Sequence, residues 1–290
     1  MSDIIVVLGT RPEILKTYST IKSLEKKVPI TIVWSGQHYD FELCEIFFDQ
    51  LDLPKPEYDL DVGSGTHASQ TESISLRLEE VVRKTKPKIV LAQGDTNTVV
   101  ATALTTAKLR IPFAHVEAGM RSFDMSMPEE VNRLVIDKIA QILFAPTANA
   151  FLNLLTEGVP PSRVHITGDT LVDVALKFTR KMKLKFLEQL SLKKNSYGLV
   201  TIHRTENTED RGRLKHILEA LGEITEKLQL IFPIHPRTKH YIEKYHFNEY
   251  LKKRKLIVIN PVGYLEFLSL LKNSMFVITD SGGVQEEATI

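Results

Sequence analysis

The sequence predicts an α/β protein with two doubly wound domains, each built on a parallel sheet. The chain has 290 residues, 43% of them hydrophobic, which is enough for two domains with buried sheets of their own. Short β-branched runs recur along the chain, and each is followed by a turn and a segment of helical period, as in strands joined by crossover helices. The runs are apolar almost throughout rather than alternating, which indicates strands buried on both faces.

Six of these runs predict the first sheet. They span residues 4–8, 30–34, 89–93, 113–117, 142–145 and 164–167. After GDTLVDVALKF the composition changes to the basic stretch KFTRKMKLKFLEQLSLKKNSYG, for which we predict a solvated helix face rather than a nucleic-acid site. We therefore place a boundary near Asp169, with a first domain over 1–169 and a second over 170–290.

Four further runs, over 197–202, 228–233, 256–259 and 275–279, predict the second sheet. The sequence then enters a helix at DSGGVQEEATI and stops. A doubly wound domain rarely ends on the first turn of a helix, so we expect the second domain to be incomplete.

Composition excludes several classes of function. With 37 basic and 36 acidic residues, the formal net charge of +1 gives no general attraction to nucleic acid or to anionic membranes. Cys44 is the only cysteine, so no internal disulfide can form, and no Cys/His spacing of the zinc type is present. The amino-terminal apolar run is too short for a signal peptide or a membrane span. We expect a cytoplasmic protein with no metal, no nucleic-acid partner and no membrane partner.

The motif LGTRPEILK follows the first predicted strand. It places Gly9, Thr10 and Arg11 at the strand's carboxyl end, with Pro12 at the start of a helix. Helix-start N–H groups together with the Arg11 guanidinium would suit a phosphate. An ordinary helix cap with a surface arginine explains this motif equally well. The dinucleotide fingerprint G-x-G-x-x-G is absent, which disfavours a nicotinamide cofactor bound in that way.

Carboxylates follow two of the buried strands. Asp95 comes directly after one strand in LAQGDTNTV, and Glu117 ends the next in AHVEAGMRS. Both should reach the crevice outside the strand ends, where ligands bind in α/β sheets. Glu129 and Glu130 lie in the first turn of a helix that begins at Pro128, where acids also favourably oppose the helix dipole. Acids converging on one cleft are suited to moving a proton.

The second domain carries cations at its strand ends. LVTIHRTEN places His203 and Arg204 after one strand, and IFPIHPRT places His235 and Arg237 after the next. A single histidine of this kind is more often structural, but the repetition indicates cations aimed at phosphate.

A small-residue loop opens the last predicted helix. Ser281, Gly282 and Gly283 in DSGGVQEEA would let backbone amides approach a diphosphate, and Glu286 or Glu287 would accept hydrogen bonds from a ribose. A tight turn is the simpler alternative, although it leaves the two following acids without an explanation.

Taken in order, these motifs resemble those of the non-hydrolysing UDP-N-acetylglucosamine 2-epimerases. The matching segments, which span the whole chain, are GTRPEILK, GQHYD, QGDTNT, HVEAGMRS, PEEVNR, TGDT, TIHRTEN, PIHPR, VGYLEF and DSGGVQEEA. The resemblance implies a GT-B architecture, in which two Rossmann-like domains face each other across a cleft. It also implies a homodimer that acts in polysaccharide biosynthesis and binds UDP-N-acetylglucosamine and UDP, with no redox cofactor.

The resemblance also implies roles for individual residues. The implied catalytic residues are Asp95, Glu117, Glu129, His203 and Lys16. The implied substrate-binding residues are Arg11, Phe267, Ser281, Gly282, Gly283 and Glu287. To these we add His235 and Arg237, which the strand-end pattern itself selects. Within these sets, Phe267 would stack on or pack near the uridine, and Glu287 would recognise the ribose. The implied reaction removes the C2 proton, expels UDP to give 2-acetamidoglucal, and re-adds UDP with protonation on the opposite face.

Other functions fit part of the pattern. A GT-B glycosyltransferase would share the donor site but would have an acceptor surface in place of the clustered acids. A hydrolysing epimerase would release N-acetylmannosamine and UDP, and a silent nucleotide-sugar sensor would not need the acids. Bacterial members of this family are often activated by a second UDP-N-acetylglucosamine molecule, through a glutamine after the GQH motif and a basic residue before QT. Here Asp40 and Ser69 stand at those two places, so the resemblance does not imply that this activation is kept.

Overall fold

The computed structural model describes residues 3–37, 48–49, 51–179, 185–252 and 255–290. The chain divides into two compact units, Met1–Thr170 and Leu171–Ile290. Each unit has its own sheet and its own apolar core. Within the described residues, no helix combines the length and the apolar character needed to cross a membrane.

The first unit is built on a parallel sheet. Its strands are β1 (Ile4–Leu8), β2 (Ile30–Trp34), β3 (Tyr58–Asp59), β4 (Ile89–Gln93), β5 (Phe113–Val116), β6 (Ile142–Ala145) and β7 (Val164–Ile166). The order in the sheet is β3-β2-β1-β4-β5-β6-β7. The six strands predicted for this sheet are all present, but the described residues add a seventh, β3. Two residues are too few to give an apolar run, so the sequence pattern missed it.

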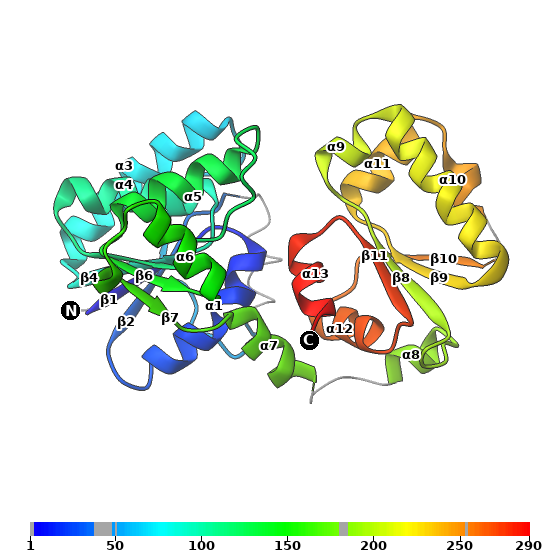
Figure 1. Cartoon of the computed structure of the whole chain (residues 1–290), viewed down its shortest axis with the longest axis horizontal. Helices are drawn as coiled ribbons and strands as arrows, with labels where there is room; N and C mark the ends of the chain where they lie inside the picture. Colours follow the sequence, from blue (N-terminus) through cyan, green and yellow to red (C-terminus); the bar gives the residue numbers. More distant parts are fainter. Residues whose placement is uncertain (1–2, 38–47, 50, 180–184, 253–254) are drawn as a thin grey trace. The chain divides into compact units, whose positions relative to one another are not determined.

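Helices cover both faces of this sheet (Figure 1). They are α1 (Arg11–Leu24), α3 (His67–Thr85), α4 (Asn97–Leu109), α5 (Pro128–Ile139) and α6 (Ala148–Thr156), with a short 3₁₀ helix, η1 (Pro161–Arg163). The connection from β1 to β2 runs along the sheet in the opposite direction from that between β4 and β5. Because such crossovers are right-handed, α1 and α4 lie on opposite faces.

Covering both faces explains the apolar character of the strands. Val6 and Leu8 point to the opposite face from Ile5 and Val7, yet all four side chains are at most 1% exposed. Burying a side chain of this size contributes about 1.5–3 kcal/mol, so each such strand adds substantially to the core. The prediction of strands buried on both faces is confirmed for β1.

The second unit has a four-stranded parallel sheet in the order β10-β9-β8-β11. Its strands are β8 (Tyr197–Thr201), β9 (Gln229–Pro233), β10 (Leu256–Ile259) and β11 (Phe276–Thr279). Its helices are α7 (Thr170–Thr179), α8 (Lys185–Gln189), α9 (Thr205–Thr208), α10 (Arg211–Lys227), α11 (Pro236–Lys244), η2 (Asn248–Lys252), α12 (Tyr264–Lys272) and α13 (Gly282–Ala288). All four predicted strands are present. Residues 180–184 of the basic stretch lie outside the described residues.

Each sheet has one place where the strand order reverses. In the first unit it lies between β1 and β4, and in the second between β8 and β11. Connections leave in opposite directions on the two sides of such a point, which opens a crevice at the carboxyl ends of the strands. The loops that follow β1, β4, β8 and β11 are therefore positioned to bind ligands.

Candidate functional site

One buried acid, Glu13, joins the two loops at the reversal point of the first unit. Its Oε2 accepts hydrogen bonds from the backbone N–H groups of Gly9 (2.5 Å) and Thr10 (3.0 Å), in the loop after β1. Its Oε1 accepts a hydrogen bond from the Thr96 hydroxyl (2.6 Å), in the loop after β4. Glu13 therefore fixes the segment that carries Arg11 relative to the segment that carries Asp95.

Burial also changes the acidity of Glu13. The residue is 3% exposed, and its desolvation raises the pKa of the carboxyl from the ordinary 4.5 to about 7. The three hydrogen bonds favour the charged form and oppose this rise, while the nearby Asp95 adds to it. The carboxyl therefore titrates close to neutral pH.

Glu117, the first residue after β5, is held in an unusual backbone conformation. Its φ of +73° lies in the left-handed region, which costs a residue with a Cβ about 1–2 kcal/mol. Its Oε1 forms a 2.7 Å ion pair with Lys16 Nζ on α1, and its Oε2 accepts a longer 3.4 Å hydrogen bond from Gln93 Nε2. The structure thus brings together two residues, Lys16 and Glu117, that the sequence analysis selected separately.

Asp95 is paired with a cation from α5. Its Oδ2 lies 2.9 Å from Nε and 2.6 Å from Nη2 of Arg133, and its carbonyl oxygen accepts a hydrogen bond from Asn132 Nδ2 at 2.7 Å. The loop after β4 is thereby attached to the start of α5. Sequence analysis did not single out Arg133, although it lies within the PEEVNR motif.

The two acids in the first turn of α5 differ in their surroundings. Glu130 is 1% exposed and accepts hydrogen bonds from Ser122 N (2.9 Å), Phe123 N (3.1 Å) and Arg133 Nη1 (2.8 Å). Burial opposes its charge, but these hydrogen bonds outweigh burial and lower its pKa. Glu130 therefore anchors the loop before α5, whereas Glu129 is exposed.

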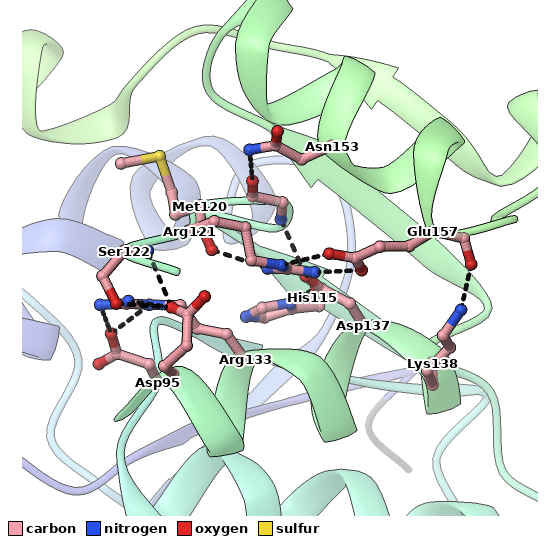
Figure 2. A network of polar contacts seen from close by, with 12 residues as sticks. Asp95, His115, Met120, Arg121, Ser122, Arg133, Asp137, Lys138, Asn153 and Glu157 are labelled. Atoms are coloured by element: carbon pink, nitrogen blue, oxygen red, sulfur yellow. Dashed lines mark hydrogen bonds and ion pairs between the residues drawn. The ribbon is translucent and has the colours of Figure 1, made fainter. Parts of the chain in front are cut away.

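A buried ionic network lies beneath the loops that carry Asp95 and Glu117. Figure 2 shows Arg121 between Asp137 and Glu157. Arg121 forms a 2.8 Å ion pair with Asp137 and a bidentate pair with Glu157 in which both N–O distances are 2.7 Å. His115 Nδ1 is 2.7 Å from Asp137, and its Nε2 is 2.8 Å from the carbonyl oxygen of Gly94.

Both ring nitrogens of His115 face oxygen acceptors, so the ring is best satisfied as a cation that donates from both nitrogens. Burial acts to lower the pKa of His115, but Asp137 and the Gly94 carbonyl raise it above its ordinary value. Asp137 also accepts a 3.0 Å hydrogen bond from Gly119 N. A Cβ at Gly119, where φ is +79°, would lie 2.2 Å from the Ala150 carbonyl oxygen. The network thus fixes the backbone at Gly94, just before Asp95, and at Gly119, just after Glu117.

In the second unit, Asp280 joins the loops at the reversal point. Its carboxylate accepts hydrogen bonds from the backbone N–H groups of His203 and Arg204 and from Asn207 Nδ2, each at 3.0 Å. Its Oδ1 also lies 3.3 Å from His203 Nδ1. Because Asp280 immediately precedes Ser281, it fixes the loop after β8 relative to the start of α13.

The strand-end histidines and Arg237 of the second unit lie together. The rings of His203 and His235 have centroids 5.4 Å apart, and Arg237 Nη1 donates to the His203 carbonyl oxygen at 3.1 Å. Desolvation lowers the pKa of His203; Asp280 opposes this shift, and the arginines Arg237 and Arg204 reinforce it. His203 is therefore favoured as a neutral ring that can donate a hydrogen bond.

The small-residue loop is open on its outer side. Ser281 caps α13 through a 3.5 Å hydrogen bond from Val284 N. A Cβ added at Gly282 or Gly283 would meet nothing within 4 Å, and neither residue has a positive φ. The chain's own packing therefore does not require glycine at either position.

The two remaining predicted residues lie on helices next to this loop. Glu287 on α13 accepts a 2.8 Å hydrogen bond from the Tyr264 hydroxyl on α12. Phe267, also on α12, is partly buried and packs against an apolar cluster that includes Tyr197 and Leu199 of β8. The structure places Glu287 and Phe267 on neighbouring helices.

Some residues of the candidate site were not evident from the sequence. The residues that sequence analysis missed are Glu13, Gln93, Arg133, His115, Asp137 and Arg121. The T-x-x-E pattern from Thr10 to Glu13 is a capping-box signature that does reveal the Thr10 contact, but not the contact with Thr96. Asp40 lies outside the described residues. Among those described, no group of three or more His, Cys, Asp or Glu side chains is placed to hold a metal ion.

Comparisons with known proteins agree on one family. The profile of the UDP-N-acetylglucosamine 2-epimerase family matches residues 22–290. The UDP-N-acetylglucosamine 2-epimerase of Methanocaldococcus jannaschii is 47% identical over 98% of this chain and 80% of its own length. The UDP-2,3-diacetamido-2,3-dideoxy-D-glucuronate 2-epimerase of Pseudomonas aeruginosa is 43% identical over the same shares of the two chains, 98% and 80%.

Solved structures agree with this assignment. The M. jannaschii UDP-GlcNAc 2-epimerase in complex with UDP-GlcNAc and UDP has a TM-score of 0.90 at 45% identity, covering 98% of this chain and 80% of that one. The Neisseria meningitidis enzyme bound to UDP-GlcNAc has a TM-score of 0.89 at 30% identity, with coverages of 98% and 79%. The fold is therefore of the GT-B type, with two Rossmann-like domains in one chain.

Proposed function

The chain belongs to the UDP-N-acetylglucosamine 2-epimerase family, and we propose that it interconverts UDP-N-acetylglucosamine and UDP-N-acetylmannosamine without net hydrolysis. The observation that carries the proposal is Glu117. A carboxylate held by Lys16 at a strand's carboxyl end, in a costly backbone conformation, is typical of a residue positioned for chemistry.

The proposed reaction begins by elimination. A carboxylate of the first unit takes the C2 proton, the C2–H electrons form the C1=C2 bond, and the C1–O bond breaks with its electron pair leaving on UDP. The product is 2-acetamidoglucal. In the return step a UDP oxygen attacks C1, and C2 receives a proton on the opposite face. Nothing is oxidised, reduced or hydrolysed, so no co-reactant is needed.

The first unit would supply the proton chemistry. We propose that Glu117 and Asp95, with the exposed Glu129, exchange the C2 proton on the two faces of the sugar. Lys16 forms an ion pair with Glu117 and Arg133 forms one with Asp95, which supports a fixed position for both carboxylates. Arg11, at the first position of α1, would bind a phosphate together with the N–H groups of that helix start.

The second unit would hold the leaving group. We propose that His203, His235 and Arg237 contact the diphosphate, because they gather at the strand ends beside the Ser281 loop. The open space beside Gly282 and Gly283 supports close approach of a phosphate to their backbone amides. Phe267 would pack near the uridine, and Glu287 would accept hydrogen bonds from the ribose.

Two alternatives remain to be distinguished by experiment. A hydrolysing epimerase would carry out the same elimination but release free N-acetylmannosamine and UDP. The P. aeruginosa relative, at 43% identity, also makes UDP-2,3-diacetamido-2,3-dideoxy-D-glucuronate a candidate substrate. Both sugars carry a 2-acetamido group, so the proposed chemistry at C2 is common to them.

The test is to incubate the purified protein with UDP-N-acetylglucosamine in deuterated water and to follow the sugars by NMR. We expect deuterium at C2 of both UDP-linked epimers, with no accumulation of free sugar. Release of N-acetylmannosamine would instead identify the hydrolysing reaction. A parallel incubation with the diacetamido-glucuronate substrate fixes the preference, because the correct substrate should have the larger kcat/KM.

A further inference from the structure

Gln93, the last residue of β4, makes contacts that the proposed function does not use. Its Nε2 donates a 2.7 Å hydrogen bond to the Thr170 hydroxyl and lies 3.4 Å from Glu117 Oε2. The short contact fixes the amide, and the longer one directs the same nitrogen at the Glu117 carboxylate. The opposite amide orientation would point Oε1 at that carboxylate, so acceptor repulsion selects the orientation in which nitrogen faces Glu117.

The carbonyl oxygen of the Gln93 amide destabilises the folded state. Gln93 is 2% exposed, and among the described residues its Oε1 has no hydrogen-bond partner. A buried acceptor without a partner destabilises the folded state, so folding alone favours an apolar side chain of similar size. A polar residue at this position therefore calls for an explanation other than stability.

Thr170 lies at a distinctive place in the chain. It is the last residue of the first unit and the first residue of α7, whose following residues pack in the second unit. Two hydrogen bonds through one amide thus connect the point where the chain enters the second unit to the Glu117 carboxylate.

We propose that Gln93 is a positioning residue for the epimerisation: held by Thr170, it orients the Glu117 carboxylate towards C2 of the substrate. The proposal rests on the proposed function, because it requires Glu117 to exchange the C2 proton. Lys16 holds one oxygen of Glu117, and Gln93 fixes the rotation of the carboxylate about that contact.

The variant that tests this is Gln93→Leu, which keeps the approximate size and removes the amide. A hydrogen bond to a charged group corresponds to a rate factor of roughly 10 to 100, so we expect kcat to fall by about that factor. Because Gln93 is proposed to act on Glu117 and not on binding, KM should change by less than about threefold. The melting temperature should match or exceed that of the wild type.

Thr105→Val is the matched control. Thr105 on α4 is 5% exposed, and its hydroxyl is likewise buried without a partner in the described part of the chain. It should keep or raise the melting temperature in the same way, with unchanged kcat. Thr170→Val should lower kcat in the same direction as Gln93→Leu, and Thr170→Ser, which keeps the hydroxyl, should restore it.

Measuring the wild-type reaction first separates the two hypotheses. If the wild-type protein gives no deuterium at C2, the proposed function fails and the role of Gln93 fails with it. If the wild type epimerises and Gln93→Leu keeps its full kcat, only the role of Gln93 is overturned. A Gln93→Leu variant whose melting temperature falls together with its activity would assign Gln93 to folding and would also overturn the proposal.

Discussion

The two reversal points of this chain are built on the same plan with different chemistry. In each, one carboxylate ties together the two loops that leave the central strands: Glu13 in the first unit and Asp280 in the second. Within the described residues Glu13 accepts hydrogen bonds from neutral donors alone, and its burial raises its pKa to about 7. Asp280 accepts neutral donors too, but it also faces the ring of His203.

This difference matches the chemistry proposed for each unit. The first unit places acids around its crevice and pairs them with Lys16 and Arg133. The second gathers histidines and an arginine around its crevice, where a departing diphosphate would be stabilised. One topology thus supplies a matched pair of loops in each unit, and the residues placed on those loops differ: acids in the first unit, histidines and an arginine in the second.

The largest expected effect comes from removing Glu117, the proposed proton-exchange group of the first unit. In Glu117→Gln, C2 deuterium exchange should fall by about 10²–10⁴-fold, the usual contribution of general acid–base catalysis. UDP affinity, measured by calorimetry, should stay close to the wild-type value because we propose that the second unit holds UDP. Loss of UDP binding in this variant would contradict the proposal that the first unit exchanges the proton and the second unit binds UDP.

The next effect concerns stability and comes from Glu13. The pKa of the Glu13 carboxyl has its ordinary value of 4.5 in the unfolded chain and is about 7 in the folded protein. Between these two pH values the folded protein therefore holds a proton that the unfolded chain has lost. Stability therefore falls as the pH rises from 4.5 to about 7, by roughly 3 kcal/mol for this group. Glu13→Gln mimics the protonated form and should remove this fall.

Denaturant unfolding of the wild type and Glu13→Gln at a series of pH values provides the measurement. The two proteins should be similar in stability near pH 4.5, and the variant should be the more stable above about pH 7. A variant that is less stable at every pH would mean that the charged carboxylate strengthens the loop connection.

A smaller effect is expected from the equivalent acid of the second unit. Asp280→Ala leaves the N–H groups of His203 and Arg204 without their partner, which should cost about 1–3 kcal/mol in stability. UDP affinity should weaken, since the loop carrying His203 and the Ser281 loop are no longer joined. Unchanged UDP affinity would show that the connection has no part in binding.

The smallest effect should come from a helix cap. Ser281→Ala removes a long cap hydrogen bond, with an expected loss of about 0.5–1 kcal/mol. Thr147→Ala, the cap of α6 with a 3.1 Å hydrogen bond, is the matched control and should show a similar loss. Of the two variants, only Ser281→Ala should weaken UDP binding. Equal UDP affinity in both variants would show that Ser281 does not contribute to binding the diphosphate.

Much of the fold follows from local patterns. Every predicted strand is present because runs such as IIVVL and IVLAQ are apolar on both faces, and this property is visible in the sequence itself. The sequence also predicts that Asp95 and Glu117 lie just beyond their strands at the same edge of the sheet, because parallel strands end at a common edge. The two-residue β3 is too short to leave such a pattern.

The long-range contacts were beyond prediction. The Thr10–Glu13 signature predicts a helix cap, but the hydrogen bond from Thr96 joins residues 83 positions apart. His115 and Asp137 are separated by 22 residues. One lies in a predicted strand and the other in a predicted helix, and no local pattern indicates that the fold buries them against each other. Gln93 and Thr170 are likewise 77 residues apart, so only the sheet brings them into contact.

The central claim is that UDP leaves C1 and returns during epimerisation. Positional isotope exchange tests this most directly, using UDP-N-acetylglucosamine labelled with oxygen-18 at the oxygen that bridges C1 and the β-phosphorus. Because the β-phosphate oxygens become equivalent by rotation once the C1–O bond has broken, the label should scramble into the non-bridging positions as the epimers form. Epimerisation with the label retained entirely at the bridge would contradict the account.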